Sequence, residues 1–293
     1  MSARFGSVIT AMVTPFDDQG DLDLDAAVDL AQWLVANGSD GLVLSGTTGE
    51  SPTLTESEEL VLFRTIRDCV TVPLLAGAGS NSTVSAVEQT KRAGELGVDG
   101  ILSVAPYYNR PSQAGLEAHF RAVAEATELP VVLYDIPART GRKISTETLL
   151  RLAIDVPNIV ALKDAAGDPA ETAKLIAMAP SQFEVYCGDD ALTLPLLAVG
   201  AVGVISVASH WVGRQLGEMI DACRKGDFQT ARQINAGLIA SYEYESGEEA
   251  PNPIPTKTLL RVLGLKVGDC RPPMGPAPDW LADSARQVLK DLN

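Results

Sequence analysis

The chain has 293 residues, of which 46% are hydrophobic and 21% are charged, with 25 Gly and 18 Pro. This composition excludes a disordered chain, a collagen-like chain and a small disulfide-stabilised domain. Acidic residues outnumber basic ones by 38 to 23, which gives a net charge of −15. So acidic a protein repels nucleic acid and anionic membrane surfaces, and we expect neither as a partner.

Cysteine use and the N-terminal segment are typical of a cytoplasmic protein. The chain has no Cys-x-x-Cys pair and no His near any of its four cysteines, at positions 69, 187, 223 and 270. We therefore expect neither a zinc site nor a disulfide framework, and we interpret the cysteines as small buried hydrophobic residues. Residues 1–6 lack the basic and then apolar pattern of a signal peptide, so we expect a cytoplasmic location.

Short apolar runs recur at fairly even distances along the chain. Most are apolar throughout rather than alternating, which is typical of strands that are buried on both faces of a parallel sheet. There are eight, over residues 8–15, 41–45, 73–76, 100–105, 130–134, 158–163, 183–187 and 201–209. Residues 191–213 carry no formal charge, but Pro195, Gly200 and Gly203 interrupt this stretch, so we interpret it as the end of a helix and a buried strand rather than a membrane span.

Amphipathic segments with helix signals lie between these runs. Asp168, Pro169 and Glu171 provide an N-cap, a first-turn proline and a capping-box acid, and Thr55 with Glu58 forms a second capping box. Strand and helix alternating eight times predict a (β/α)₈ barrel. A doubly wound sheet is the alternative, but no Gly-x-Gly-x-x-Gly segment opens a helix after the first strand.

The pattern beyond residue 209 becomes helical. Helices are predicted over residues 212–224, 228–244 and 257–263, and a proline-rich passage precedes a last short helix. An eighth barrel helix and an appended tail account for this length without a second independent domain. We expect a barrel over residues 1–224 and a C-terminal helical extension, packed on the barrel, over residues 225–293.

Lys163 is the sharpest candidate for chemistry, because functional residues of such barrels lie where the strands end. It closes an apolar run, so its amine is expected inside the barrel mouth, where loss of solvation lowers the pKa from about 10.4 toward neutrality. An amine of this kind can form a Schiff base with a ketone. The alternative is a lysine that extends into solvent or pairs with Asp164.

Other strand ends carry groups that could bind a small anion or move protons. Thr47 and Thr48, between two glycines, offer hydroxyls and backbone N–H groups that suit a carboxylate, although an ordinary turn is the alternative. Arg139 suits a substrate carboxylate or a salt bridge within its loop. Three tyrosines can pass protons or pack at the rim: Tyr107, Tyr108 and Tyr134.

We interpret the remaining polar candidates as structural residues. His119 and His210 are distant in sequence, and no His or carboxylate cluster has ligand spacing, so we expect no metal and no other cofactor. Asp189 and Asp190 could form an acid and base pair, but capping of the next helix is the favoured interpretation.

Six motifs, taken together and in order, resemble the dihydrodipicolinate synthase branch of the pyruvate-dependent class I aldolases. They cover nearly the whole chain and read Gly46-Thr-Thr-Gly-Glu-Ser51, Pro106-Tyr-Tyr-Asn-Arg-Pro-Ser112, Tyr134-Asp-Ile-Pro-Ala-Arg-Thr-Gly141, Leu162-Lys163, Gly188-Asp-Asp190 and Pro251-Asn-Pro-Ile-Pro255. The resemblance implies a homotetrameric barrel enzyme, built from dimers, that condenses pyruvate with L-aspartate 4-semialdehyde in lysine and diaminopimelate biosynthesis.

The same resemblance implies roles for individual residues. Lys163 would form the pyruvate Schiff base and enamine, and Tyr134, Thr47 and Tyr108 would relay protons, with Tyr108 reaching in from a neighbouring subunit. Four more residues would bind substrate: Thr47 shares the pyruvate carboxylate with Thr48, Arg139 holds the semialdehyde carboxylate, and Gly188 and Ile205 line the pocket. Asp135 and Asp164 stand where Asn and Glu are usual or frequent, and both changes are conservative.

Two alternatives stay open beside this function. One is another Schiff-base pyruvate aldolase, acting on N-acetylneuraminate or a 2-keto-3-deoxy sugar acid, and Arg139 together with Thr47-Thr48 argues against it. The other is a non-catalytic barrel that binds an α-keto acid, which would require Lys163 or the hydroxyl relay to be missing.

Feedback control by lysine is where the sequence departs most from the family. Ser51, Asn81 and Tyr107 match the inhibitory lysine pocket. Three positions differ, with Glu56, Glu59 and Ser85 in place of the His, His and Glu of lysine-sensitive members. Because Ser85 supplies no carboxylate for the amine of lysine, we expect weak or absent inhibition.

Overall fold

The computed structural model describes residues 3–292, and its eight parallel strands form one closed barrel in the order β1 to β8. The (β/α)₈ class is therefore confirmed. Each strand falls on one of the eight predicted apolar runs, and β3, β5 and β6 end one residue beyond the run. The strands are β1 (Val8–Ala11), β2 (Gly41–Leu44), β3 (Leu74–Gly77), β4 (Gly100–Val104), β5 (Val131–Asp135), β6 (Ile159–Asp164), β7 (Glu184–Cys187) and β8 (Gly203–Ser206).

Two of the predicted runs, the first and the eighth, end several residues too late, because side chains take over the hydrogen bonds at their ends. The N–H of Val13 donates to His210 Nε2 at 3.1 Å, and the strand that begins the chain ends at Ala11. The N–H of Ser209 donates to Ser206 Oγ at 2.8 Å, and Ser209 begins a helix instead of closing the eighth strand. A local apolar pattern contains neither interaction.

The chain divides into two compact units, and the first comprises the segment up to Ser7 together with Pro73–Ile205. Strands β3 to β7 and most of β8 belong to it, and consecutive strands pair in parallel. The N–H of Val204 donates to the Ser7 carbonyl at 2.8 Å, and a Cβ on Gly203 would lie 2.3 Å from that oxygen, so the close approach requires glycine. The helices are α3 (Thr83–Gly94), α4 (Gln113–Glu125), α5 (Pro137–Thr140), α6 (Thr146–Asp155), α7 (Pro169–Met178), η2 (Asp190–Leu192) and α8 (Thr193–Val199).

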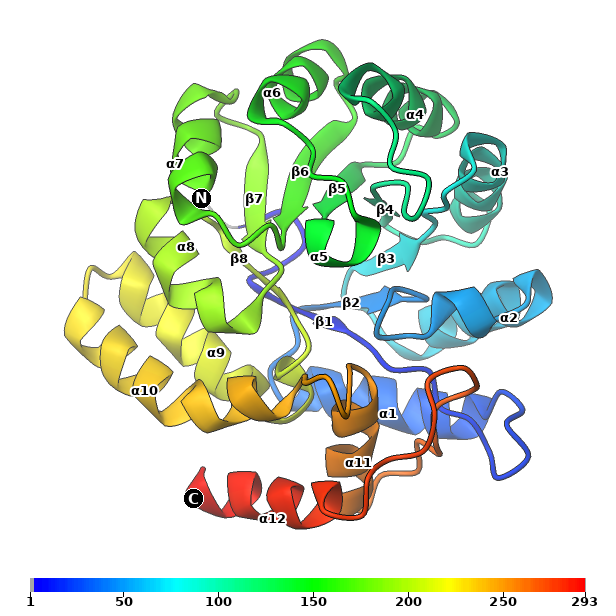
Figure 1. Cartoon of the computed structure of the whole chain (residues 1–293), viewed down its shortest axis with the longest axis vertical. Coiled ribbons are helices and arrows are strands. Elements are labelled where there is room, and N and C mark those ends of the chain that lie inside the picture. The colour runs from blue at the N-terminus through cyan, green and yellow to red at the C-terminus, as the bar shows by residue number, and fades with distance from the viewer. Residues whose placement is uncertain (1–2, 293) are drawn as a thin grey trace. The chain divides into compact units, whose positions relative to one another are not determined.

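The second unit comprises Val8–Val72 and the chain from Ser206 onward. It holds β1 and β2, and Figure 1 shows α10 lying beside α9 and α12 lying beside α10 and α11. Helix α11 begins three residues earlier than predicted, because Pro255 fits its first turn. The helices are α1 (Leu24–Ala36), η1 (Ser51–Thr53), α2 (Glu56–Cys69), α9 (Ser209–Arg224), α10 (Phe228–Tyr244), α11 (Ile254–Val262) and α12 (Leu281–Asp291).

Two predicted helix starts are confirmed, one in each unit. Asp168 caps α7 by accepting from the Glu171 N–H, with Pro169 in the first turn. Thr55 and Glu58 form the capping box of α2. The predicted division at residue 224 falls between α9 and α10, and the division into barrel and extension stays a prediction.

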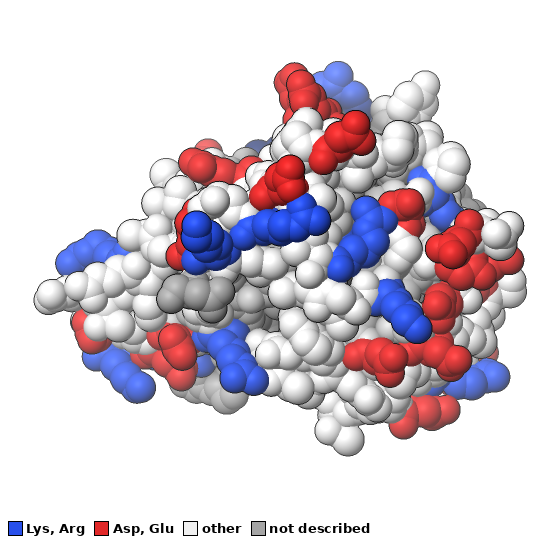
Figure 2. All heavy atoms as spheres, turned by 90° about the horizontal axis from the view of Figure 1, so that it is seen from below, with Lys and Arg blue, Asp and Glu red and all other residues white. Residues whose placement is uncertain are grey.

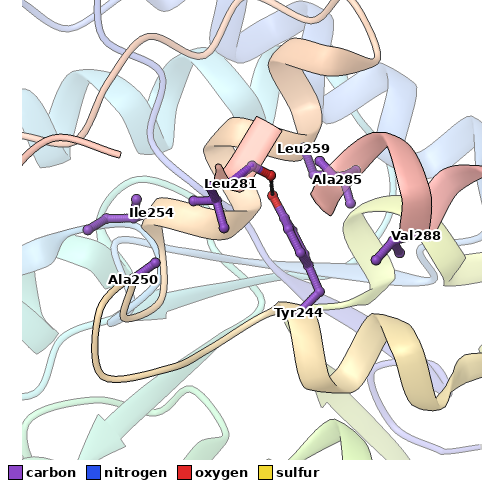
Figure 3. Close-up of a cluster of buried hydrophobic side chains, with 7 residues drawn as sticks. All are labelled: Tyr244, Ala250, Ile254, Leu259, Leu281, Ala285 and Val288. Carbon is purple, nitrogen blue, oxygen red and sulfur yellow. Dashed lines mark hydrogen bonds between the residues drawn. The ribbon is translucent and has the colours of Figure 1, made fainter. Parts of the chain in front are cut away.

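A small apolar cluster joins the last three helices. Figure 3 shows the ring of Tyr244 between side chains of α11 and α12, with its hydroxyl directed at the Leu281 carbonyl. The same hydroxyl donates to the Pro255 carbonyl at 3.1 Å, which ties the first turn of α11 to the end of α10. The seven buried members are Tyr244, Ala250, Ile254, Leu259, Leu281, Ala285 and Val288.

The charges on the surface and the burial of the cysteines can be compared with what the sequence predicted. On the face in Figure 2, Lys and Arg side chains lie among Asp and Glu rather than forming a separate basic field. None of the helices in residues 3–292 is long and apolar enough to cross a membrane.

All four thiols are free, but only Cys187 is buried. The interpretation as buried residues is therefore wrong for three half-buried cysteines, Cys69, Cys223 and Cys270.

Candidate active site

Lys163 and Tyr134 lie side by side at the carboxyl ends of β6 and β5. They are register partners, and each is 5% exposed. The Lys163 Nζ lies 4.3 Å from the centroid of the Tyr134 ring. The lysine therefore does not extend into solvent, and the predicted amine and phenol come together from distant segments of the sequence.

Asp135 and Asp164 follow these two residues and are register partners of each other. Successive side chains of a strand point to opposite faces, so the carboxylates lie on the helix side of the sheet. Asp164 accepts from Thr172 Oγ1 at 2.6 Å, and Asp135 Oδ2 lies 3.8 Å from Lys143 Nζ. Burial raises the pKa of Asp135 to about 7, against the smaller lowering effects of the Ile144 N–H and of Lys143.

Gly188 gives the side chain of Lys163 its space. A Cβ on Gly188 would lie 2.9 Å from Lys163 Cγ and 3.1 Å from Lys163 Cε, closer than neighbouring side chains tolerate. The Gly188 N–H also donates to the Asp164 carbonyl at 2.7 Å, which fixes the end of β7 against β6. Ile205, the second predicted lining residue, is buried in β8.

The tyrosines after β4 differ in exposure. Tyr107 is half-buried, whereas Tyr108 is 89% exposed and has a φ of 72°. A bulky residue in the left-handed region costs about 1–3 kcal/mol and is held there only by its surroundings. Asn109 Nδ2 donates to the Asn81 carbonyl at 2.8 Å and joins this loop to the one after β3. Tyr108 thus lies at the surface, outside the buried pair of Lys163 and Tyr134.

Arg139 lies on α5, the single helical turn that directly follows β5. The turn ends at Gly141, which has a φ of 72°, and its inner side is fixed by Thr140, whose hydroxyl donates to the Ile136 carbonyl at 3.1 Å. Arg139 itself is exposed. The fold therefore presents a guanidinium five residues beyond Tyr134 on a short rigid turn.

The loop after β2 carries the two predicted threonines in the second unit. It is a tight turn, in which the Ser51 N–H donates to the Gly46 carbonyl at 3.2 Å and the Glu50 N–H donates to the Thr47 carbonyl at 3.1 Å. Thr47 is half-buried, and Thr48 is 3% exposed. The hydroxyl of Thr48 accepts from Asn252 Nδ2 at 2.9 Å.

Sequence reasoning missed the residues that hold this loop. Glu50 Oε1 lies 2.7 Å from Lys257 Nζ, and Glu50 Oε2 accepts from the Arg271 N–H at 2.8 Å. Burial lowers the pKa of Lys257, and the charge of Glu50 opposes that change. One sequence signal could have identified Lys257. It lies among hydrophobic and hydroxyl residues of α11, whereas a solvent-exposed helix face would carry several charged residues.

The structure also places the residues that depart from the lysine pocket. Glu59 is buried and accepts a hydrogen bond from Ser45, and burial raises its pKa to about 7. Glu56 is exposed at the start of α2. Ser85 is exposed in the first turn of α3, where its N–H donates to Ser82 Oγ.

The histidines and the aspartate pair have the structural positions that were expected. His210 Nε2 accepts from Val13 and its Nδ1 donates to Val207, while His119 Nδ1 bonds Thr83 Oγ1, and burial lowers both histidine pKa values to about 4. Asp189 caps η2 by accepting from the Ala191 N–H. The described part of the chain contains no group of three His, Cys, Asp or Glu side chains that could hold a metal ion.

Comparisons with known proteins agree over nearly the whole chain. Residues 4–292 match the dihydrodipicolinate synthetase family. The 4-hydroxy-tetrahydrodipicolinate synthase of Thermosynechococcus vestitus is 50% identical, over 98% of this chain and 97% of that protein. The dihydrodipicolinate synthase of Cyanidioschyzon merolae, solved with lysine bound, is 45% identical with a TM-score of 0.95 over 98% of each chain. The chloride-inhibited synthase of Acinetobacter baumannii, complexed with pyruvate, is 37% identical with a TM-score of 0.93, over 98% of this chain and 99% of that one.

Proposed function

The chain belongs to the dihydrodipicolinate synthetase family, and we propose that it is a 4-hydroxy-tetrahydrodipicolinate synthase. It condenses pyruvate with L-aspartate 4-semialdehyde, in lysine and diaminopimelate biosynthesis. The observation that carries this proposal is the buried Lys163 amine, 4.3 Å from the Tyr134 ring centroid at the carboxyl end of the barrel strands.

The reaction starts at Lys163. The neutral amine attacks C2 of pyruvate, and loss of water gives the Schiff base. Loss of a methyl proton converts it to an enamine, whose carbon attacks the aldehyde of the semialdehyde. The amine of that substrate then attacks C2, closes the ring and releases Lys163. The product is 4-hydroxy-tetrahydrodipicolinate.

Proton transfer is assigned to Tyr134, Thr47 and Tyr108. Tyr134 is supported most directly, because its phenol ring lies against the nucleophile. Tyr108 is 89% exposed in a strained backbone conformation, which supports a role at a subunit contact rather than within its own chain. We accordingly propose a homotetramer built from dimers in which Tyr108 reaches the neighbouring site.

Substrate binding is assigned to five residues that lie at or after strand ends. Thr47 and Thr48 hold the pyruvate carboxylate, and Arg139, exposed on its short turn, holds the carboxylate of the semialdehyde. Gly188 leaves room for the Lys163 side chain, and Ile205 lines the pocket. The four free cysteines support a cytoplasmic location, because disulfides are rare there.

Borohydride reduction in the presence of pyruvate tests the function. A pyruvyl-derived mass should appear on the peptide that contains Lys163, and Lys163→Ala should abolish both this adduct and turnover. Arg139→Ala should keep the adduct and impair the semialdehyde step. An unmodified Lys163 in the wild type would exclude the synthase, and turnover with N-acetylmannosamine in place of the semialdehyde would favour a sialic acid aldolase.

A further inference from the structure

Asn252 lies two residues before α11, and its side chain reaches the loop after β2. Its Nδ2 donates to Thr48 Oγ1 at 2.9 Å. Thr48 is 3% exposed and Asn252 is 8% exposed, so the bond is shielded from water. We propose that Asn252 is a positioning residue that turns the hydroxyl hydrogen of Thr48 toward the pyruvate carboxylate. The inference rests on the proposed function of Thr48 as a pyruvate ligand.

The chemistry of a hydroxyl makes this assignment directional. A threonine hydroxyl has one hydrogen to donate and two lone pairs that accept. Because Asn252 donates to one lone pair, the hydrogen of Thr48 points away from Asn252. The orientation of the Asn252 amide is fixed as well, since its Oδ1 accepts a hydrogen bond from Thr256 Oγ1 at 3.3 Å. The amide nitrogen therefore faces Thr48 and the amide oxygen faces Thr256.

Contacts of the C-terminal helices fix the first turn of α11, which begins two residues after Asn252. The first turn of α11 is tied to α10 by the bond from Tyr244 to the Pro255 carbonyl, and Ile254 of the same turn belongs to the apolar cluster of Figure 3. Further along the same helix, Lys257 pairs with Glu50, two residues beyond Thr48. The chain from Asn252 into α11 thus contacts the threonine loop at two points, and the donor is preorganised before substrate binds.

A preorganised donor to a carboxylate has a measurable effect on affinity. Hydrogen bonds to charged groups are stronger than neutral ones, and losing one weakens binding about tenfold to hundredfold. The loss should appear in the KM for pyruvate, because only pyruvate places its carboxylate at Thr48. The KM for the semialdehyde and the melting temperature should change little.

The decisive comparison is between Asn252→Ala and Asn252→Asp, assayed at about pH 8, where a carboxylate is ionised. The Asp side chain keeps the shape of Asn but only accepts hydrogen bonds, so it draws the Thr48 hydrogen away from the substrate. We expect Asn252→Asp to raise the KM for pyruvate more than Asn252→Ala does. If Asn252 only filled space, the isosteric Asp would be the milder change, so that order of effects overturns the proposal.

A double-mutant cycle tests whether Asn252 acts through Thr48. Thr48→Val should raise the KM for pyruvate about tenfold or more, and adding Asn252→Ala to it should have little further effect. Multiplicative effects, or an equal rise in the KM for the semialdehyde, overturn the proposal. Asn37→Asp is the matched control, because Asn37 also donates from its Nδ2, to the Trp33 carbonyl at 2.8 Å at the end of α1.

The wild-type protein separates this inference from the function on which it rests. If the wild type forms no borohydride-stable adduct with pyruvate, the proposed function fails. If the wild type forms the adduct and turns over, and Asn252→Ala leaves the KM for pyruvate within about twofold, the function stands and the positioning role is wrong. For a variant whose turnover is too low for a KM, the amount of borohydride-trapped adduct at limiting pyruvate measures the affinity for pyruvate instead.

Discussion

Lys257 Nζ lies 2.7 Å from Glu50 Oε1, and each side chain is 1% exposed. A buried pair of this kind repays the loss of hydration only through good geometry and additional hydrogen bonds. Both partners have additional hydrogen bonds, since Lys257 Nζ donates to the Asp269 carbonyl at 3.0 Å and Glu50 accepts from the Arg271 N–H. The pair therefore ties α11 and the chain after it to the loop that follows β2.

Replacing Lys257 by Met should destabilise the protein strongly. The change leaves the Glu50 carboxylate buried without its counter-charge, which costs about 3–5 kcal/mol of unfolding free energy. Urea denaturation measures the loss, and the double variant Lys257→Met with Glu50→Gln should recover part of it. Lys174→Met is the control, because Lys174 is 47% exposed and lies 3.8 Å from Glu147. An equal effect of the two lysine variants would contradict this prediction.

Replacing Gly188 by Ala should impair Schiff-base formation without unfolding the protein. The new Cβ would lie 2.9 Å from Lys163 Cγ, so the nucleophile must move, and displacements of about 1 Å cost catalysts up to about a hundredfold. The measurement is the rate of borohydride trapping with pyruvate. Gly237→Ala provides a control, because a Cβ there meets no atom within 4 Å in the middle of α10. Trapping at the wild-type rate in Gly188→Ala would refute the steric role.

Asp135 should make stability depend on pH. Its folded-state pKa, about 7, lies above the ordinary value of 3.8, mainly because of burial. The folded state therefore binds the proton more tightly, and its contribution to stability is present below pH 4 and lost as pH rises through 7. The stability of Asp135→Asn relative to wild type should increase by roughly 2–4 kcal/mol over this window. Urea midpoints at a series of pH values test this, and a constant difference would disprove it.

Lysine should inhibit this protein weakly or not at all. Ser85 is exposed in the first turn of α3 and carries no charge, so it offers no ion pair to the amine of lysine. Glu59, with a pKa raised to about 7, is hydrogen-bonded by the buried Ser45. Turnover measured against increasing L-lysine checks this, with Ser85→Glu as the variant expected to increase inhibition. An inhibition constant near that of lysine-sensitive synthases would overturn it.

Local patterns were sufficient for the elements and for several site positions. The capping residues Asp168 and Thr55 start their helices as predicted, and α10 has the predicted bounds Phe228–Tyr244. These features depend on neighbours within one or two turns, so a sequence window contains their cause. The error at the end of the first run has the opposite origin, because its deciding bond comes from His210, far along the chain.

The sequence by itself determined the barrel class, the starts of the capped helices α2 and α7 and the residues at the strand ends, because apolar runs, caps and strand order are local properties. Only the tertiary structure decided which of those residues meet. Lys163 faces Tyr134 because β5 and β6 pair in one register, and Asn252 reaches Thr48 across 204 residues of chain. Contacts of that separation depend on packing of the whole chain, and the buried pair of Glu50 and Lys257 is stable only where packing excludes water from both charges.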